Sequence, residues 1–237
     1  MKKIIVIFIT LFVSAAAIIP APVYTDEVKG FKKFQLMPQD DSVKDNEFSN
    51  FITKFKKDVK SRNIDLLKKS ISPDISWSFG NNEGIKNFLK NWKLNKNPKN
   101  SPFWDEIEKV LSLGSAFYNE EKTSHAFPYL FVTFPADYDQ FQFAALTGKK
   151  INIRKKASSK SAVIETLDYE IVKPVASPDP RKKETVGGFK GEWIEVITAS
   201  GKTGYVFSRY IHSSIGYRAI FEKKGKTWVM TAFISGD

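Results

Sequence analysis

The sequence predicts an α+β N-terminal domain, with helices packed on an antiparallel sheet, and an all-β small barrel after it. Apolar residues at helical spacing fill much of residues 45–114, and short alternating strands fill residues 151–211. The 237-residue chain is 42% hydrophobic and 14% aromatic and contains no cysteine. These values indicate a globular protein that is held together by core packing without disulfides.

The first elements are two helices. Phe48, Phe51, Ile52, Phe55 and Val59 repeat at helical spacing, in a helix that begins near Asp45. Asn63 is the expected N-cap of a second helix that carries apolar residues as far as Ile71. The sequence Ser72-Pro73-Asp74 is expected to end this helix.

A strand and two further helices follow. Residues 75–79 alternate with period two and predict a half-buried strand that ends at Gly80-Asn81-Asn82. An apolar stripe over residues 85–92 predicts the third helix. Ser101 as N-cap, Pro102 at the first helical position and Gly114 as C-cap define the fourth.

The remaining elements of this domain are predicted to be strands. Three aromatic-rich segments, 116–118, 129–134 and 141–143, are read as β-structure. Residues 217–221 and 228–233, separated by a Lys-Lys-Gly-Lys turn, predict a C-terminal hairpin. Two positions remain open for this hairpin: in the sheet of the first domain, or packed on the barrel.

Residues 63–67 (Asn-Ile-Asp-Leu-Leu) and 72–77 (Ser-Pro-Asp-Ile-Ser-Trp) place a short helix and an Asp before the first strand. With the terminal hairpin, this arrangement resembles the cone-shaped α+β fold of nuclear transport factor 2-like domains. The resemblance implies a cone-shaped interior, and the helix near residues 103–113 is an addition to that pattern. An apolar ligand pocket there would be lined by aromatic residues: Trp77, Phe79, Trp92, Tyr129, Phe131 and Trp228. Packing of these side chains as a core is the alternative.

The second half contains a series of short strand motifs in a fixed order. They are Ile151-Asn-Ile-Arg154, Val163-Ile164, Leu167, Trp193-Ile-Glu-Val196, Gly204-Tyr205-Val206 and Tyr210-Ile211. In this order they resemble the bacterial SH3-like (SH3b) domain, which implies a small closed barrel that binds or targets. Ala157, Tyr169-Glu170 and a long segment at 174–192 depart from the family pattern, so a ligand groove carried over from the family is in doubt.

The predicted organisation is therefore a signal peptide at 1–25, an α+β domain at 26–145 with the returning hairpin 214–237, and an SH3-like barrel at 146–213. The segment 174–192, which contains Pro174, Pro178 and Pro180, is expected to project from the barrel as a loop. If the hairpin joins the first sheet, the barrel is an insertion rather than an appendage.

The N-terminus has the features of an export signal. Lys2 and Lys3 precede an apolar stretch at residues 4–19, and small residues follow it. That stretch is shorter than the roughly 20 residues that a spanning helix needs. We therefore expect a periplasmic or secreted protein with no transmembrane segment after signal cleavage, an uncleaved anchor being the alternative.

Positive charge is concentrated in the predicted barrel. Residues 147–213 carry 13 basic and 7 acidic side chains, whereas residues 26–146 carry 18 and 17. A local positive field favours anionic partners. Outside the cytoplasm these are cell-wall or other envelope polymers, lipid headgroups or acidic proteins rather than nucleic acid. A generally basic protein kept soluble by its charge is the alternative interpretation.

No catalytic, cofactor or metal site is predicted. His125 and His212 are expected to be packed or surface residues, because two histidines without the usual spacing do not make a zinc site. The absence of cysteine excludes thiol peptidases. Glu106 and Glu108 point apart on a helix, and Asp137 and Asp139 lie in a turn, so neither pair suits glycoside hydrolysis.

The prediction is thus a non-catalytic binding protein that recognises a peptide or an anionic cell-envelope component. Candidate ligand-binding residues are aromatic and basic, as in peptide grooves of small barrels: Tyr169, Phe189, Tyr205, Tyr210, Arg154 and Lys155. Trp193 is assigned to the core. The alternatives are a hydrolase or isomerase with its pocket in the N-terminal domain, and a structural or secretion-accessory protein.

Overall fold

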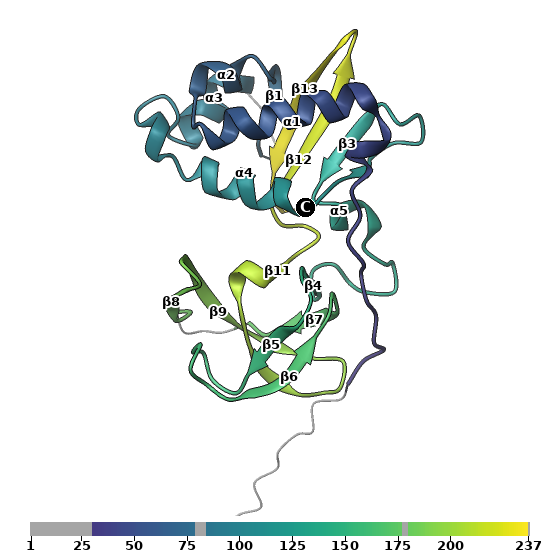
Figure 1. The fold of residues 1–237 in the computed structure, drawn as a ribbon, viewed down its shortest axis with the longest axis vertical. Coiled ribbons are helices and arrows are strands. Elements are labelled where there is room, and N and C mark those ends of the chain that lie inside the picture. The colour runs from purple at the N-terminus through teal and green to yellow at the C-terminus, as the bar shows by residue number, and fades with distance from the viewer. Residues whose placement is uncertain (1–29, 79–83, 177–179, 237) are drawn as a thin grey trace, which may run out of the picture.

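The computed structural model describes residues 30–78, 84–176 and 180–236. The predicted signal peptide lies outside these residues. The fold is mixed α+β, with a five-stranded sheet and an eight-stranded sheet that lie in separate halves of the molecule (Figure 1). Within the described ranges, no helix combines the length and apolarity needed to cross a membrane.

The first half packs helices on the five-stranded sheet, whose strand order is β1-β13-β12-β3-β2. Its longer elements are the helices α1 (Asn46–Lys60), α2 (Ile64–Lys68), α3 (Gly84–Asn91) and α4 (Phe103–Ser112), and the strands β1 (Ile71–Ser76), β2 (Ala116–Phe117), β3 (Ser124–Phe127), β12 (Arg218–Lys224) and β13 (Thr227–Ile234). Apolar side chains from all four helices and most of these strands form one core. The core is aromatic-rich and includes Phe48, Phe55, Phe103, Trp104 and Phe221.

The predicted starts of α1 and α2 are confirmed by their hydrogen bonds. The Asp45 carboxylate accepts the Phe48 N–H at 2.9 Å at the start of α1. The Asn63 side chain accepts the N–H groups of residues 65 and 66 at the start of α2. The caps of α4 differ from the prediction by one residue, because the N-cap is Pro102 rather than Ser101 and the C-cap is Leu113. Gly114 follows with φ +78°, the left-handed conformation that favours glycine after a helix.

The sequence Pro73-Asp74, predicted to break a helix, lies inside strand β1. The preceding helix α2 already ends at Lys68, and β1 begins at Ile71. Among the described strands, β1 is at the edge of its sheet and pairs, in parallel, with β13 alone. A proline is tolerated there because an edge strand does not need all its N–H groups for pairing.

The prediction of a strand at 129–134 was wrong. This segment forms the short helix α5 (Leu130–Thr133), in which the N–H groups of residues 132 and 133 donate to the Tyr129 carbonyl. A short continuous apolar run carries no period that separates strand from helix. The predicted strand at 141–143 is a turn, in which the Asp139 carboxylate accepts the Phe141 N–H. Strand β3, which had not been predicted, occupies 124–127.

The C-terminal hairpin β12–β13 belongs to the five-stranded sheet. Strand β12 lies between β13 and β3, with Ile220 opposite both Ala232 and Ala126. The chain therefore leaves this sheet after β3 and returns to its middle only at residue 218. Figure 1 shows the hairpin in yellow beside the helices of the first half.

The second half is an antiparallel sheet with strand order β11-β4-β7-β9-β10-β5-β6 and with β8 paired to β9. Its strands are β4 (Ala144–Leu146), β5 (Ile151–Arg154), β6 (Val163–Leu167), β7 (Ile171–Pro174), β8 (Lys183–Val186), β9 (Phe189–Ile197), β10 (Thr203–Phe207) and β11 (Ile211–His212). Among the described residues this path is open at β11 and β6, so the predicted closed barrel is not found.

The predicted loop at 174–192 contains regular structure. Strand β8 and the start of β9 form a hairpin, with residues 183 to 186 opposite residues 192 to 189. The turn consists of Gly187 and Gly188, whose φ angles are +58° and +83°. Two positive φ values suit the type I′ turns of short hairpins, which explains the Gly-Gly pair.

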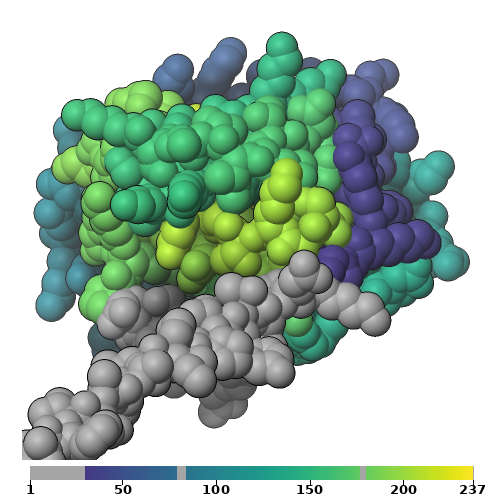
Figure 2. All heavy atoms as spheres, turned by 90° about the horizontal axis from the view of Figure 1, so that it is seen from below, coloured from purple at the N-terminus to yellow at the C-terminus, as the bar shows by residue number. Residues whose placement is uncertain are grey.

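The N-terminal segment 30–40 links the two halves. It was expected to be an irregular lead-in, and in the structure its backbone bonds to the eight-stranded sheet. The Leu36 N–H donates to the Tyr169 carbonyl at 2.8 Å, and the Ile171 N–H donates to the Phe34 carbonyl at 3.0 Å. Figure 2 shows this segment in purple along one side of the green strands. From there it continues to α1 in the other half (Figure 1).

Both histidines are buried. The His125 ring stacks on Phe48 with 3.8 Å between centroids, and neither ring nitrogen has a hydrogen-bond partner among the described residues. Burial lowers the pKa of His125 from 6.5 to about 4. The pKa of His212, whose Nε2 lies 3.2 Å from the Tyr217 carbonyl oxygen, is also lowered to about 4 by burial.

These histidines predict a loss of stability in mild acid. Between pH 6.5 and about 4 the unfolded chain binds protons that the folded chain does not bind. The free energy of unfolding should therefore fall by about 1.4 kcal/mol per pH unit for each histidine as the pH decreases. In His125→Phe, urea titrations across this range should show about half of the histidine-dependent slope. A slope equal to that of the unmodified protein would contradict the assignment.

Candidate functional site

A groove on the eight-stranded sheet combines aromatic and basic side chains. It has a volume of about 270 Å³ and lies where β5, β9, β10 and the loop after β5 meet. We call it the aromatic–basic groove and define it by six of its lining residues: Trp193, Phe207, Tyr210, Lys149, Lys150 and Arg154.

The aromatic residues come from adjacent elements. Trp193 on β9 and Phe207 on β10 are direct partners across the antiparallel pair, and their rings are 5.6 Å apart. Tyr210, in the 3₁₀ turn η3 (Ser208–Tyr210), lies 6.3 Å from Phe207. Trp193 and Phe207 are almost fully buried and Tyr210 is half-buried. The rings thus form a fixed apolar floor with an accessible phenol at one end.

The basic residues lie at the two ends of β5. Lys149 and Lys150 precede the strand, and Lys150 has φ +53° with its N–H donated to the Asp168 carboxylate at 2.5 Å. Arg154 ends the strand and donates from Nη1 to the Ser161 carbonyl at 2.6 Å. No acidic residue is among the described residues that line the groove. Its local field therefore favours an anionic ligand.

Glu184 on the β8–β9 hairpin is not among the lining residues of the groove, but its carboxylate bonds to two of them. Glu184 Oε2 accepts the Trp193 indole N–H at 2.6 Å and the Ser159 backbone N–H at 3.0 Å. The Ser159 hydroxyl donates to the other oxygen, Oε1. Hydrogen bonds from Ser159 and Trp193 lower the pKa of this carboxyl.

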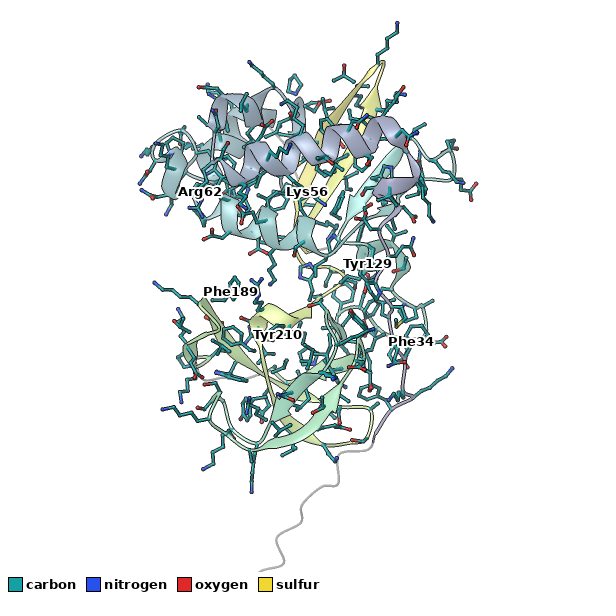
Figure 3. The ribbon with its side chains drawn as sticks, viewed as in Figure 1. Phe34, Lys56, Arg62, Tyr129, Phe189 and Tyr210 are labelled. Atoms are coloured by element: carbon teal, nitrogen blue, oxygen red, sulfur yellow. The ribbon has the colours of Figure 1, made fainter. Side chains whose placement is uncertain are left out.

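The structure distributes the predicted ligand-binding residues over several places. Arg154 and Tyr210 line the groove. Phe189 is exposed at the start of β9, with the Arg209 guanidinium 3.3 Å above its ring centroid. Phe189 and Tyr210 both lie on the side of the sheet turned toward the helices (Figure 3).

The other three candidates lie outside the groove lining. Tyr205 is opposite Arg154 on the neighbouring strand, and burial raises its pKa. Tyr169 has φ +52° and bonds through its backbone to Leu36 and Gly148, next to the N-terminal segment. Lys155 is exposed just beyond the end of β5.

Sequence analysis missed several residues of the site. Trp193 was assigned to the core; it is buried, and it also contributes to the lining of the groove. Phe207, Lys149 and Lys150 were not selected. The Phe207–Trp193 register was the signal available for Phe207, because two aromatic residues on neighbouring strands of a hairpin face each other.

The aromatic residues of the first half are packed rather than open to a pocket. Trp92 and Trp228 belong to the main core and are less than a tenth exposed. Trp77 packs against the same core, and Phe131 packs against a small cluster beside it. Tyr129 is buried in another cluster and donates its hydroxyl to the Leu36 carbonyl at 2.8 Å. The sixth candidate, Phe79, is outside the described residues.

A second hollow of about 490 Å³ lies on the β8–β9 hairpin itself, between Lys183 and Glu192. It is larger but is formed by a single hairpin. The aromatic–basic groove brings together side chains from several elements, which is the arrangement expected of a specific site. Within the described part of the chain, no group of three or more potential metal ligands is found.

In the comparisons with known proteins, no family model, no curated protein and no solved structure matches this chain. The function is therefore argued from the residues of the groove.

The close packing behind the groove makes Gly191 a test of its geometry. A Cβ at this position would lie 2.6 Å from Phe207 Cζ and 2.7 Å from Ser208 Oγ. Gly191→Ala should therefore displace the Phe207 ring and lower the free energy of unfolding by about 1–3 kcal/mol. Urea titration measures this loss. Lys190→Ala, one residue away and exposed, is the matched control and should remain within about 0.5 kcal/mol of the parent. Equal stability of the two variants would contradict the geometry.

Proposed function

We propose that this chain is an exported, non-catalytic binding protein whose aromatic–basic groove recognises a peptide or another anionic component of the cell envelope. The observation that carries the proposal is the groove itself: Trp193, Phe207 and Tyr210 lie beside Lys149, Lys150 and Arg154 in one hollow of about 270 Å³. Aromatic surfaces bind extended chains through contact area, and the cations select for negative charge.

Two features of the sequence support the cell-envelope assignment. Lys2, Lys3 and the apolar stretch that follows have the pattern of an export signal, which supports a location in the periplasm or outside the cell. The 13 basic and 7 acidic residues of the segment 147–213 give the groove region a positive excess. The polymers that such a region meets outside the cytoplasm include anionic wall components.

We also propose that the eight-stranded sheet is an SH3-like unit and that the first half is related to nuclear transport factor 2-like domains. For the SH3-like unit, the support is the order of strand motifs from residue 151 to residue 211. Peptide recognition by an aromatic-lined groove is a common use of such small β-units. For the first half, the support is the helix–helix–strand–helix order and the returning hairpin β12–β13.

The alternative of a hydrolase or isomerase requires an open pocket in the first half. The described aromatic residues that would line that pocket pack within hydrophobic clusters. We therefore propose a binding function and no catalytic one.

The binding proposal predicts a charge-dependent interaction with purified cell wall. In a co-sedimentation assay at low salt, the chain should bind the wall, and binding should weaken as salt screens the cations. Lys149→Gln/Lys150→Gln removes two charges from the groove. This variant should bind roughly three- to tenfold more weakly, since each lost surface interaction contributes up to about 1 kcal/mol.

The matched control is Lys155→Gln/Lys156→Gln. It removes the same net charge from exposed residues just beyond β5 that are not in the groove lining. Its affinity should stay close to that of the parent chain. Equal weakening of the two double variants would indicate non-specific charge attraction, and no binding at low salt would reject the proposed function.

A further inference from the structure

The Glu184 carboxylate is held by donors that belong to the groove. Ser159 and Trp193 both line the groove, and they direct three N–H or O–H donors at this one side chain. Glu184 itself comes from β8 and is not among the lining residues of the groove. The donor set is therefore formed by the groove, and its present acceptor is supplied by a different element.

The three donors form a suitable arrangement for any carboxylate. Both oxygens are bound, Oε2 by the indole and backbone N–H groups and Oε1 by the Ser159 hydroxyl. Hydrogen bonds to a charged acceptor are roughly twice as strong as neutral ones. The cations of the same groove, Lys149, Lys150 and Arg154, add attraction for a negative group. Neither the donors nor the cations require that the carboxylate belong to this chain.

The element that carries Glu184 is attached on one side only. Strand β8 pairs with β9 and with no other strand in the described structure, and the turn that joins them is Gly187-Gly188. Lys183 and Glu192, which face each other across this hairpin, form an exposed ion pair at 3.7 Å. Exposed pairs of this kind contribute little to stability. Glu184 can therefore leave its donors without disturbing the order of the main sheet.

We propose that Ser159 and Trp193 form a carboxylate subsite of the groove, that Glu184 occupies this subsite in the free protein as an internal competitor, and that the ligand is a peptide with a free carboxylate. This inference rests on the function proposed above and names its ligand class. The peptide carboxylate takes the three hydrogen bonds from Glu184, while the rest of the peptide lies along the aromatic floor. The hairpin carboxylate moves to solvent.

An internal competitor lowers the apparent affinity of the ligand. The measured dissociation constant equals the intrinsic constant divided by the fraction of molecules in which the subsite is free. If Glu184 leaves the subsite in about one molecule in ten, removing its charge tightens carboxylate binding roughly tenfold. The same change leaves the binding of an uncharged analogue unaltered.

The test uses two probes, N-acetyl-Gly-Gly-Ala as the free acid and the same peptide as its C-terminal amide. Isothermal titration of the chain from residue 26 onward measures both affinities in the parent and in Glu184→Ala. We expect the variant to bind the acid roughly tenfold more tightly than the parent does, and the amide with unchanged affinity. The Trp193 indole N–H resonance should shift on addition of the acid.

Two further variants complete the design. Glu192→Gln removes a carboxylate from the same hairpin that does not contact Ser159, and it should behave as the parent. Glu184→Gln keeps the shape of the side chain. It replaces Glu184→Ala in the test if the alanine variant unfolds the β8–β9 hairpin. Adding Ser159→Ala to Glu184→Gln removes a donor of the subsite and should abolish the gain in acid binding.

The outcomes separate this inference from the proposed function. If Glu184→Ala and Glu184→Gln bind the acid no more tightly than the parent, while wall binding persists, the internal competitor is overturned and the groove remains. An equal gain for acid and amide overturns the carboxylate subsite. If the parent chain does not bind the cell wall, the proposed function is rejected, regardless of the peptide affinities.

Discussion

The return of the C-terminal hairpin to the middle of the five-stranded sheet is the constraint on which the rest of the structure depends. Strand β12 fills the position between β13 and β3, so the first half cannot complete its sheet until the last residues have been placed. The segment that builds the eight-stranded sheet is consequently anchored at both of its ends. The N-terminal segment adds a third connection through Leu36 and Ile171. A chain without cysteine thereby fixes two sheets relative to each other by topology, backbone hydrogen bonds and side-chain packing.

That anchoring explains how the groove obtains a rigid floor and one adjustable wall. Trp193 and Phe207 lie on β9 and β10, which pair along five residues and bury their side chains. Glu184 lies on β8, which pairs with β9 alone among the described strands. Rings fixed by packing lose little conformational entropy when a ligand binds, whereas a hairpin attached on one side can exchange its contacts. Strands β9 and β10 thus provide the fixed binding surface, and β8 provides the contact that can exchange.

The ends of several elements could be predicted because they depend on nearby residues. Features that depend on a distant strand partner could not be predicted from the sequence. Asp45, Asn63 and Gly114 act within four residues of themselves, so their roles follow from the sequence. The edge position of β1, which lets Pro73 sit in a strand, depends on a partner about 155 residues away. Helix α5 carries no period that separates it from a strand. For the site, Arg154 and Tyr210 could be selected as basic and aromatic residues of short strands. The contact of Glu184 with Ser159, 25 residues apart, has no local signal.

The Glu184 contact also provides a hydrogen-bond acceptor for the buried Trp193 indole N–H when no ligand is bound. Trp193 is almost fully buried, and a buried indole N–H without a partner costs about 1–3 kcal/mol. Glu184 satisfies that N–H, together with the N–H and hydroxyl of Ser159, when no ligand is bound. A peptide carboxylate then replaces an equivalent acceptor, so the exchange adds little net free energy at the subsite. A ligand without a carboxylate leaves those donors bonded to Glu184 and gains nothing at the subsite. The subsite therefore contributes selectivity, and the aromatic floor and the cations supply the affinity.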